Sequence, residues 1–178
     1  MSPPTPLEPP GGKGRADAPA PLGAGLEPGA KRLLKVAMAA LARREHSRAE
    51  IERKLAQKIS PQDSGQDVAE VLRLLQERGL QSDRRMAEAL VRTRGARYGR
   101  RRISQELERR GVDRETIAAV LPPLESEIEL ARAIWRRKFG KAPASLQERA
   151  RQSRFLAARG FSSGVIGRVI GAEDDGPA

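Results

Sequence analysis

Groups able to carry out covalent catalysis are scarce in this chain. It contains one histidine and no cysteine, which leaves few ways to pair a nucleophile with a base. His46 immediately precedes Ser47 at the expected start of a helix, so we expect a histidine of the capping region or the surface. A metal site would instead need three or four converging donors. The sequence therefore predicts a non-enzyme without catalytic residues, metal or cofactor.

A basic cluster between residues 92 and 110 is the main candidate for function. Eight arginines stand there against two glutamates, an excess that attracts phosphates or the acidic surface of a protein. The residues predicted to contact a partner or nucleic acid are Arg94, Arg97, Tyr98, Arg101, Arg102 and Arg109. An arginine-rich face that is merely solvated stays open as the alternative. Arg136, Arg137 and Lys138 form a smaller second patch.

The remaining aromatic and acidic residues favour structural roles. Trp135, Phe139, Phe155 and Phe161 fall within or beside an apolar helical pattern, so we expect them in a core. Tyr98 lies in a loop, where packing and partner contact are both open. Glutamates lie at ion-pair spacing, Glu50 with Lys54 and Glu106 with Arg110, which is typical of solvated helix faces.

Charge and composition limit the compartment and the class of partner. The 34 lysines and arginines exceed the 23 acidic residues by 11, with a pI near 11.0, which attracts polyanions. The sequence shows no secretion signal, and its apolar runs are far shorter than the ~20 residues of a membrane span. The absence of cysteine fits a reducing compartment. We therefore expect a cytoplasmic protein without membrane contact.

The elements that must position the basic cluster are helices. From Lys31 onward apolar residues recur at steps of three and four, and alternating strand patterns are absent. The expected helices span residues 31–44, 47–58, 67–78, 83–95, 99–110, 113–121, 125–138, 145–159 and 162–171. Residues 1–30 contain eight of the 13 prolines and are predicted to be a disordered tail. Residues 172–178 are expected to form a short acidic tail.

An internal repeat organises these helices. One apolar triplet occurs three times at intervals of 49 residues. Its copies are Val68, Val71 and Leu72, then Ile117, Val120 and Leu121, then Ile166, Val169 and Ile170. In the helix before, Ile51 and Leu55 match Ile103 and Leu107 at an offset of 52, and the segment 110–112 matches 159–161 at 49. A third helix precedes each pair. The repeating unit is therefore a three-helix module.

Three such modules predict an elongated molecule. We expect modules at residues 31–79, 80–124 and 125–171, stacked in a curved, all-α array in which neighbours stabilise one another. The long faces of such an array suit a filament or a duplex better than a small-molecule substrate, which needs a deep pocket. We expect a monomer.

Four stretches of the sequence resemble the RecX family. They are Ala40 to Ser47 leading into Ile51 and Leu55, Leu80 to Ala87 followed by Val91 and Arg92, Tyr98-Gly99 with Ile103, Leu107 and Gly111-Val112, and Arg154-Phe155-Leu156 with Arg159-Gly160-Phe161. Two positions depart from the family pattern. Met86 stands where phenylalanine is usual, and Arg100 where proline is common; both residues are compatible with helices.

The resemblance implies a function as well as a fold. Members of the RecX family are all-α proteins of tandem three-helix modules that bind the RecA–DNA filament, and reduce ATP hydrolysis and strand exchange in recombination and DNA repair. The family offers no catalytic residue or cofactor to carry over. The alternative that the residues leave open is a sequence-independent nucleic-acid-binding module that acts without RecA.

Overall fold

The computed structural model describes residues 21–61 and 63–171, which contain nine α-helices and no strand. The helices are α1 (Pro28–Leu41), α2 (Arg48–Ala56), α3 (Gly65–Glu77), α4 (Asp83–Arg94), α5 (Arg100–Arg109), α6 (Arg114–Val120), α7 (Leu124–Lys138), α8 (Leu146–Ala157) and α9 (Ser163–Gly171). Each expected helix is present within a few residues. The prediction of an all-α fold is confirmed.

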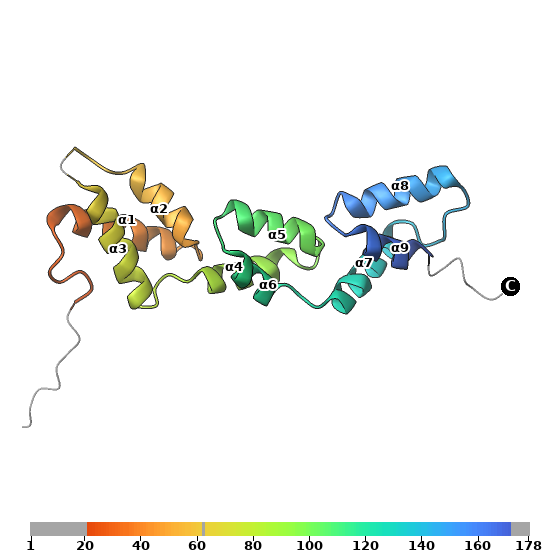
Figure 1. The fold of residues 1–178 in the computed structure, drawn as a ribbon, viewed down its shortest axis with the longest axis horizontal. Coiled ribbons are helices and arrows are strands. Elements are labelled where there is room, and N and C mark those ends of the chain that lie inside the picture. Colours follow the sequence, from red (N-terminus) through yellow and green to blue (C-terminus); the bar gives the residue numbers. More distant parts are fainter. Residues whose placement is uncertain (1–20, 62, 172–178) are drawn as a thin grey trace, which may run out of the picture.

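The nine helices form three triplets that follow one another along the long axis of the molecule (Figure 1). We call α1–α3 the first module, α4–α6 the second and α7–α9 the third. Each module has its own apolar core, centred for example on Leu33 and Ile51 in the first, Ile103 and Leu107 in the second, and Trp135 and Phe161 in the third. Because these cores are separate clusters, the contacts that join the modules must be of another kind.

The first module begins earlier than the sequence predicted. Residues 21–30, assigned to a disordered tail, include a turn and the first residues of α1, and Leu26 and Ala30 are buried in the core of the module. Pro28 occupies the first turn of α1, where a missing N–H costs no hydrogen bond. Residues 1–20 and the acidic segment 172–178 lie outside the described residues.

Local signals in the sequence position most helix ends correctly. Gly79, Gly111, Gly140 and Gly160 all have positive φ, as expected of residues that end helices in the left-handed conformation. Ser47, at the expected start of α2, forms a capping box with Glu50. Ser64 caps α3 in the same way, in a capping box with Asp67, the third residue of that helix.

The aromatic residues of the third module pack as predicted. Trp135 and Phe161 are almost fully buried, and Phe139 and Phe155 pack against the same core with their rings at right angles, 5.1 Å apart. The indole N–H of Trp135 donates to the buried Gln152 side chain at 2.7 Å. These rings therefore hold α7, α8 and α9 together.

Candidate partner-binding site

The first and second modules are joined by polar contacts at the start of α2, which we call the first junction. The Ser47 hydroxyl donates to the Arg110 carbonyl, at the turn that follows α5. The Arg48 backbone N–H donates to the Asp83 carboxylate at the start of α4, at 2.7 Å. The backbone N–H groups in the first turn of a helix have no partner within the helix, and here the second module supplies an acceptor for one of them, that of Arg48 in α2.

The second and third modules are joined in the same way at the start of α5, the second junction. The Gly99 N–H donates to the Arg159 carbonyl at 2.9 Å. The Arg100 N–H donates to the Glu127 carboxylate of α7, also at 2.9 Å. Gly99 and Arg100 lie 52 residues after Ser47 and Arg48, and Arg159 lies 49 after Arg110. The two junctions therefore occupy equivalent places in the repeat, with the Gly99 N–H donating at the second where the Ser47 hydroxyl donates at the first. Together they fix three separate cores into one array.

Each junction depends on a glycine in a turn that contacts the neighbouring module: the turn after α5 at the first junction and the turn after α8 at the second. Gly111 has a φ of +82°, and a Cβ there would lie 2.5 Å from the Cβ of Ala49. Gly160 has a φ of +84°, and a Cβ there would collide with Arg102. Glycine is required for both the backbone conformation and the close approach.

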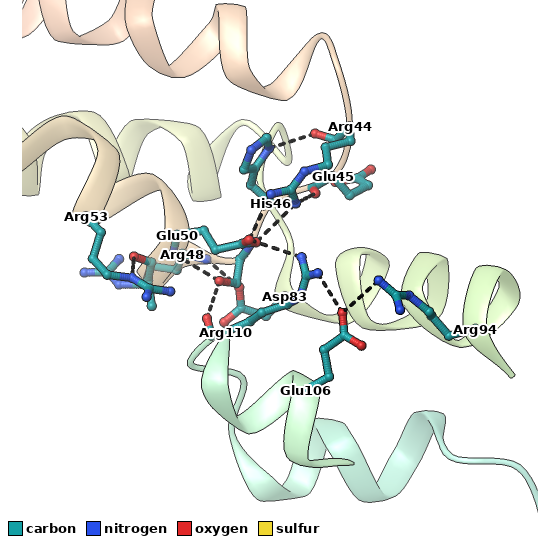
Figure 2. A network of polar contacts seen from close by, with 12 residues as sticks. Arg44, Glu45, His46, Arg48, Glu50, Arg53, Asp83, Arg94, Glu106 and Arg110 are labelled. Carbon is teal, nitrogen blue, oxygen red and sulfur yellow. Dashed lines mark hydrogen bonds and ion pairs between the residues drawn. The ribbon is translucent and has the colours of Figure 1, made fainter. Parts of the chain in front are cut away.

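The first junction carries a network of ion pairs (Figure 2). Arg110 contacts Glu50 at 3.1 Å and Glu106 at 2.8 Å. Arg44 also contacts Glu50, at 2.9 Å, and Arg94 approaches Glu106 at 3.6 Å. The Glu106–Arg110 pair was expected, but Glu50 pairs across the junction and not with Lys54. The expectation of solvated faces was wrong here, because the carboxylates of Glu50 and Glu106 lie between helices.

Glu50 is held in its charged form. Burial alone would raise its pKa, but hydrogen bonds from Arg44 and the Ser47 N–H, together with the charges of Arg44 and Arg110, outweigh it and lower the pKa below the ordinary 4.5. An ionised Glu50 is therefore part of the first junction at neutral pH.

His46 lies beside this network and is 5% exposed. Its Nδ1 is 2.9 Å from the Arg44 carbonyl, and its own carbonyl accepts from the Gln81 amide at 3.2 Å. Burial lowers the pKa of His46 below 6.5. A position next to the α2 cap was expected, but the alternative of a surface residue was wrong because the junction covers the ring. No group of three or more potential metal ligands occurs in the described part of the chain.

Three of the predicted contact residues line an open groove at the second junction. We call it the second groove; it has a volume of about 690 Å³, and its lining includes Arg97, Tyr98 and Arg102. The guanidinium of Arg102 lies over the Tyr98 ring at 4.4 Å and donates to the Ala158 carbonyl at 2.9 Å. Tyr98 also packs against the core of the second module and is partly exposed, so the packing role that the sequence left open is present.

Arg101, Arg102 and Arg109 line a smaller adjoining hollow of about 290 Å³, between α5 and α8. Arg101 and Arg109 are exposed, and the Arg109 side chain donates to the Gln105 carbonyl one turn earlier. Because Arg102 belongs to both hollows, five of the six predicted residues surround one stretch of surface.

Arg94 is placed elsewhere. It lies at the end of α4 beside the first junction, in a groove of about 270 Å³ that also includes Arg44, Glu45, Glu106 and Arg110. Its approach to Glu106 compensates part of its charge. Arg94 is thus separated from the other five residues by its position on another groove.

The second groove contains two arginines besides the six predicted contacts: Arg137, which the sequence placed in the smaller second patch, and Arg159, which was not predicted as a contact. Arg137 of α7 and Arg159, after α8, also line it, and the Arg159 guanidinium lies 3.7 Å from the centre of the Phe155 ring. The repeat offset offered a signal, since it relates Arg159 to Arg110. Arg137 and Arg159 come near Arg102 because of the way the third module docks on the second. The helical pattern of the sequence carries no information on that docking.

The fold and this surface define a class of protein: a row of three-helix modules with polar junctions and an arginine-lined groove. No described helix is long and apolar enough to cross a membrane. Family models match the second and third modules, as "RecX, second three-helix domain" over residues 82–121 and "RecX, third three-helix domain" over residues 125–170.

Sequence relatives and solved structures agree with these matches. The chain is 41% identical over 140 residues to the regulatory protein RecX of Ralstonia pickettii, covering 78% of this chain and 86% of the relative. It is 43% identical over 145 residues to RecX of Pseudomonas entomophila, covering 79% and 90%. The crystal structure of RecX from Lactobacillus salivarius has the same fold, with a TM-score of 0.71 at 19% identity over 82% of this chain and 97% of that one. The chain belongs to the RecX family of regulatory proteins.

Proposed function

We propose that this chain binds the RecA–DNA filament and modulates it, mainly by inhibiting ATP hydrolysis and strand exchange in recombination and DNA repair. The observation that carries the proposal is identity above 40% with regulatory RecX proteins over most of their length. The resemblance set out above implies RecA as the partner of this family. The proposed activity is binding without catalysis or cofactor, by a cytoplasmic monomer.

The geometry supports binding to a long polymeric partner. The modules lie in a row (Figure 1), and the arginines around the second junction are spread over two adjoining hollows on α5 and α8. Contacts would be made by Arg97, Tyr98, Arg101, Arg102 and Arg109. Arg94 would contribute less, because Glu106 already compensates part of its charge.

Cosedimentation with RecA filaments tests the proposal. RecA assembled on single-stranded DNA with a slowly hydrolysed ATP analogue is pelleted with the chain present. We expect the chain in the pellet only when RecA is present, and less of it for a variant with Arg101 and Arg109 both changed to glutamate. Recovery of the folded chain in the supernatant at all RecA concentrations would contradict the proposal.

Direct nucleic-acid binding is a second candidate, favoured by the exposed Arg101 and Arg109. In that case the basic face of the chain would bind DNA directly, without RecA. Phosphate contacts release counterions, so such binding weakens steeply with salt. A salt titration with labelled DNA and no RecA separates the two functions. Tight, salt-sensitive binding without RecA would favour the second candidate.

A further inference from the structure

The two junction grooves occupy equivalent places in the repeat but differ in charge. The first groove, beside α4 and α5, contains Glu45 and Glu106 next to Arg110, with Glu50 bonded to the same arginine. Applying the repeat offsets of 52 and 49 residues relates Glu45 to Arg97, Glu50 to Arg102, Glu106 to Phe155 and Arg110 to Arg159. Three carboxylates, two of which pair with Arg110, are thus replaced, and the arginine is kept as Arg159.

As a result, the arginines of the second groove have no carboxylate partner among the described residues. Arg97, Arg102, Arg137 and Arg159 line it, and none of the ion pairs found in the described residues involves them. Two of them lie over aromatic rings, Arg102 over Tyr98 and Arg159 over Phe155. A ring face attracts a guanidinium but carries no net charge. The groove therefore keeps its positive charge.

The first groove indicates which anion such a site accepts. There the Glu50 carboxylate accepts from Arg44 at 2.9 Å, from Arg110 at 3.1 Å and from the Ser47 N–H at 3.0 Å. Planar guanidinium groups match the planar carboxylate with paired hydrogen bonds. We infer that the second groove binds carboxylate side chains of an acidic segment of a partner protein, which supply the charge that the chain itself supplies in the first groove.

Two features favour an acidic peptide over a nucleic-acid strand. Part of the lining is apolar, from Ala96, Ile134 and Ala158, which suits the aliphatic parts of a peptide better than a phosphodiester backbone. Tyr98, the one aromatic residue in the lining of this groove, already carries the Arg102 guanidinium on one face of its ring, whereas a single strand would need open faces for base stacking. The inference goes beyond the proposed function, because it holds for any protein partner and its test contains no RecA.

The test measures binding of a short fluorescein-labelled peptide of aspartate, glutamate and leucine to the full chain by fluorescence anisotropy. A peptide with asparagine and glutamine at the acidic positions is the matched probe. We expect the acidic peptide to bind at least about tenfold more tightly. We also expect Arg102→Glu, which recreates the carboxylate of the first groove beside Arg159, to lose at least about tenfold in affinity.

Controls separate groove binding from general charge and from misfolding. Arg114→Glu changes the net charge equally on α6, away from the groove, and should bind within about twofold of the unchanged protein. Arg159→Gln should lose affinity without adding a negative charge, and circular dichroism should show native helix content for all three variants. Equal binding of both peptides, or equal loss in Arg102→Glu and Arg114→Glu, would overturn the inference. So would tighter, Arg102-dependent binding of a labelled oligothymidylate, which would identify a nucleic-acid site.

Discussion

Arg110 and Glu50 lie 60 residues apart in the chain and form an ion pair of 3.1 Å that connects α5 to α2. Arg110 extends this connection to Glu106, and Glu50 extends it to Arg44. The first two modules have separate apolar cores. The orientation of one module on the other therefore depends on polar contacts.

Removing the charge of Glu50 should destabilise the protein. In Glu50→Gln, Arg44 and Arg110 lose an ionised partner whose side chain is only 14% exposed, so we expect the free energy of unfolding to fall by about 1–3 kcal/mol. Urea denaturation measures it. The matched control is Glu77→Gln, which breaks an exposed pair with Arg73 and should cost less than about 1 kcal/mol. Equal losses in the two variants would contradict the role given to Glu50.

Gly111→Ala should perturb the first junction more than a glycine change at an open turn. The new methyl group would meet Ala49, and the φ of +82° is unfavourable for alanine. Gly79→Ala is the control, since its φ is +63° but nothing lies near its Cβ position, so it should cost only about 1–2 kcal/mol of backbone strain. Thermal unfolding should rank Gly111→Ala clearly below Gly79→Ala. The reverse order would mean that the turn after α5 does not dock as closely as described.

Stability should decrease with acidification below pH 6.5 because of His46. Burial lowers its pKa in the folded state below 6.5, so the unfolded state takes up the proton first as the pH falls. The contribution of neutral His46 to the free energy of unfolding is complete above pH 6.5. It is lost as the pH falls from 6.5 through the pKa of His46 in the folded state. Free energies of unfolding between pH 7 and about 5 should decline less in His46→Gln than in the unchanged protein. Glu50 titrates in a lower range, below pH 4.5. Parallel curves for the two proteins would contradict the assignment.

Most of the fold follows from the sequence, because its periodicity is local. The apolar repeat gives the helices, and the offsets of 49 and 52 residues relate the modules. The start of α1 was missed because Pro and Gly dominate residues 1–30, although Leu26 and Ala30 are buried. Composition describes a segment as a whole, whereas burial depends on single side chains.

The candidate site is less accessible to sequence reasoning. Glu50 was expected to pair with Lys54, four residues later on its helix, but its partner Arg110 lies in the next module. Arg137 and Arg159 join Arg97 and Arg102 only because the third module docks on α5. Helical spacing determines neighbours within an element, and neighbours across a junction require the docked structure.

The predicted contact residues should not be equivalent in filament binding. Arg97 is exposed and has no ion pair in the described part of the chain, whereas Arg94 lies 3.6 Å from Glu106. Arg97→Gln should therefore weaken cosedimentation with RecA filaments by about three- to tenfold, and Arg94→Gln by less. A larger effect of Arg94→Gln would move the contact surface to the first groove.

ATP hydrolysis by RecA on single-stranded DNA, measured as this chain is titrated in, tests the central claim most directly. The account predicts that the hydrolysis rate falls at amounts of the chain equal to RecA or below it, and that Arg101→Glu with Arg109→Glu requires more protein for the same effect. An unchanged hydrolysis rate over that whole range, with the chain folded by circular dichroism, would contradict it.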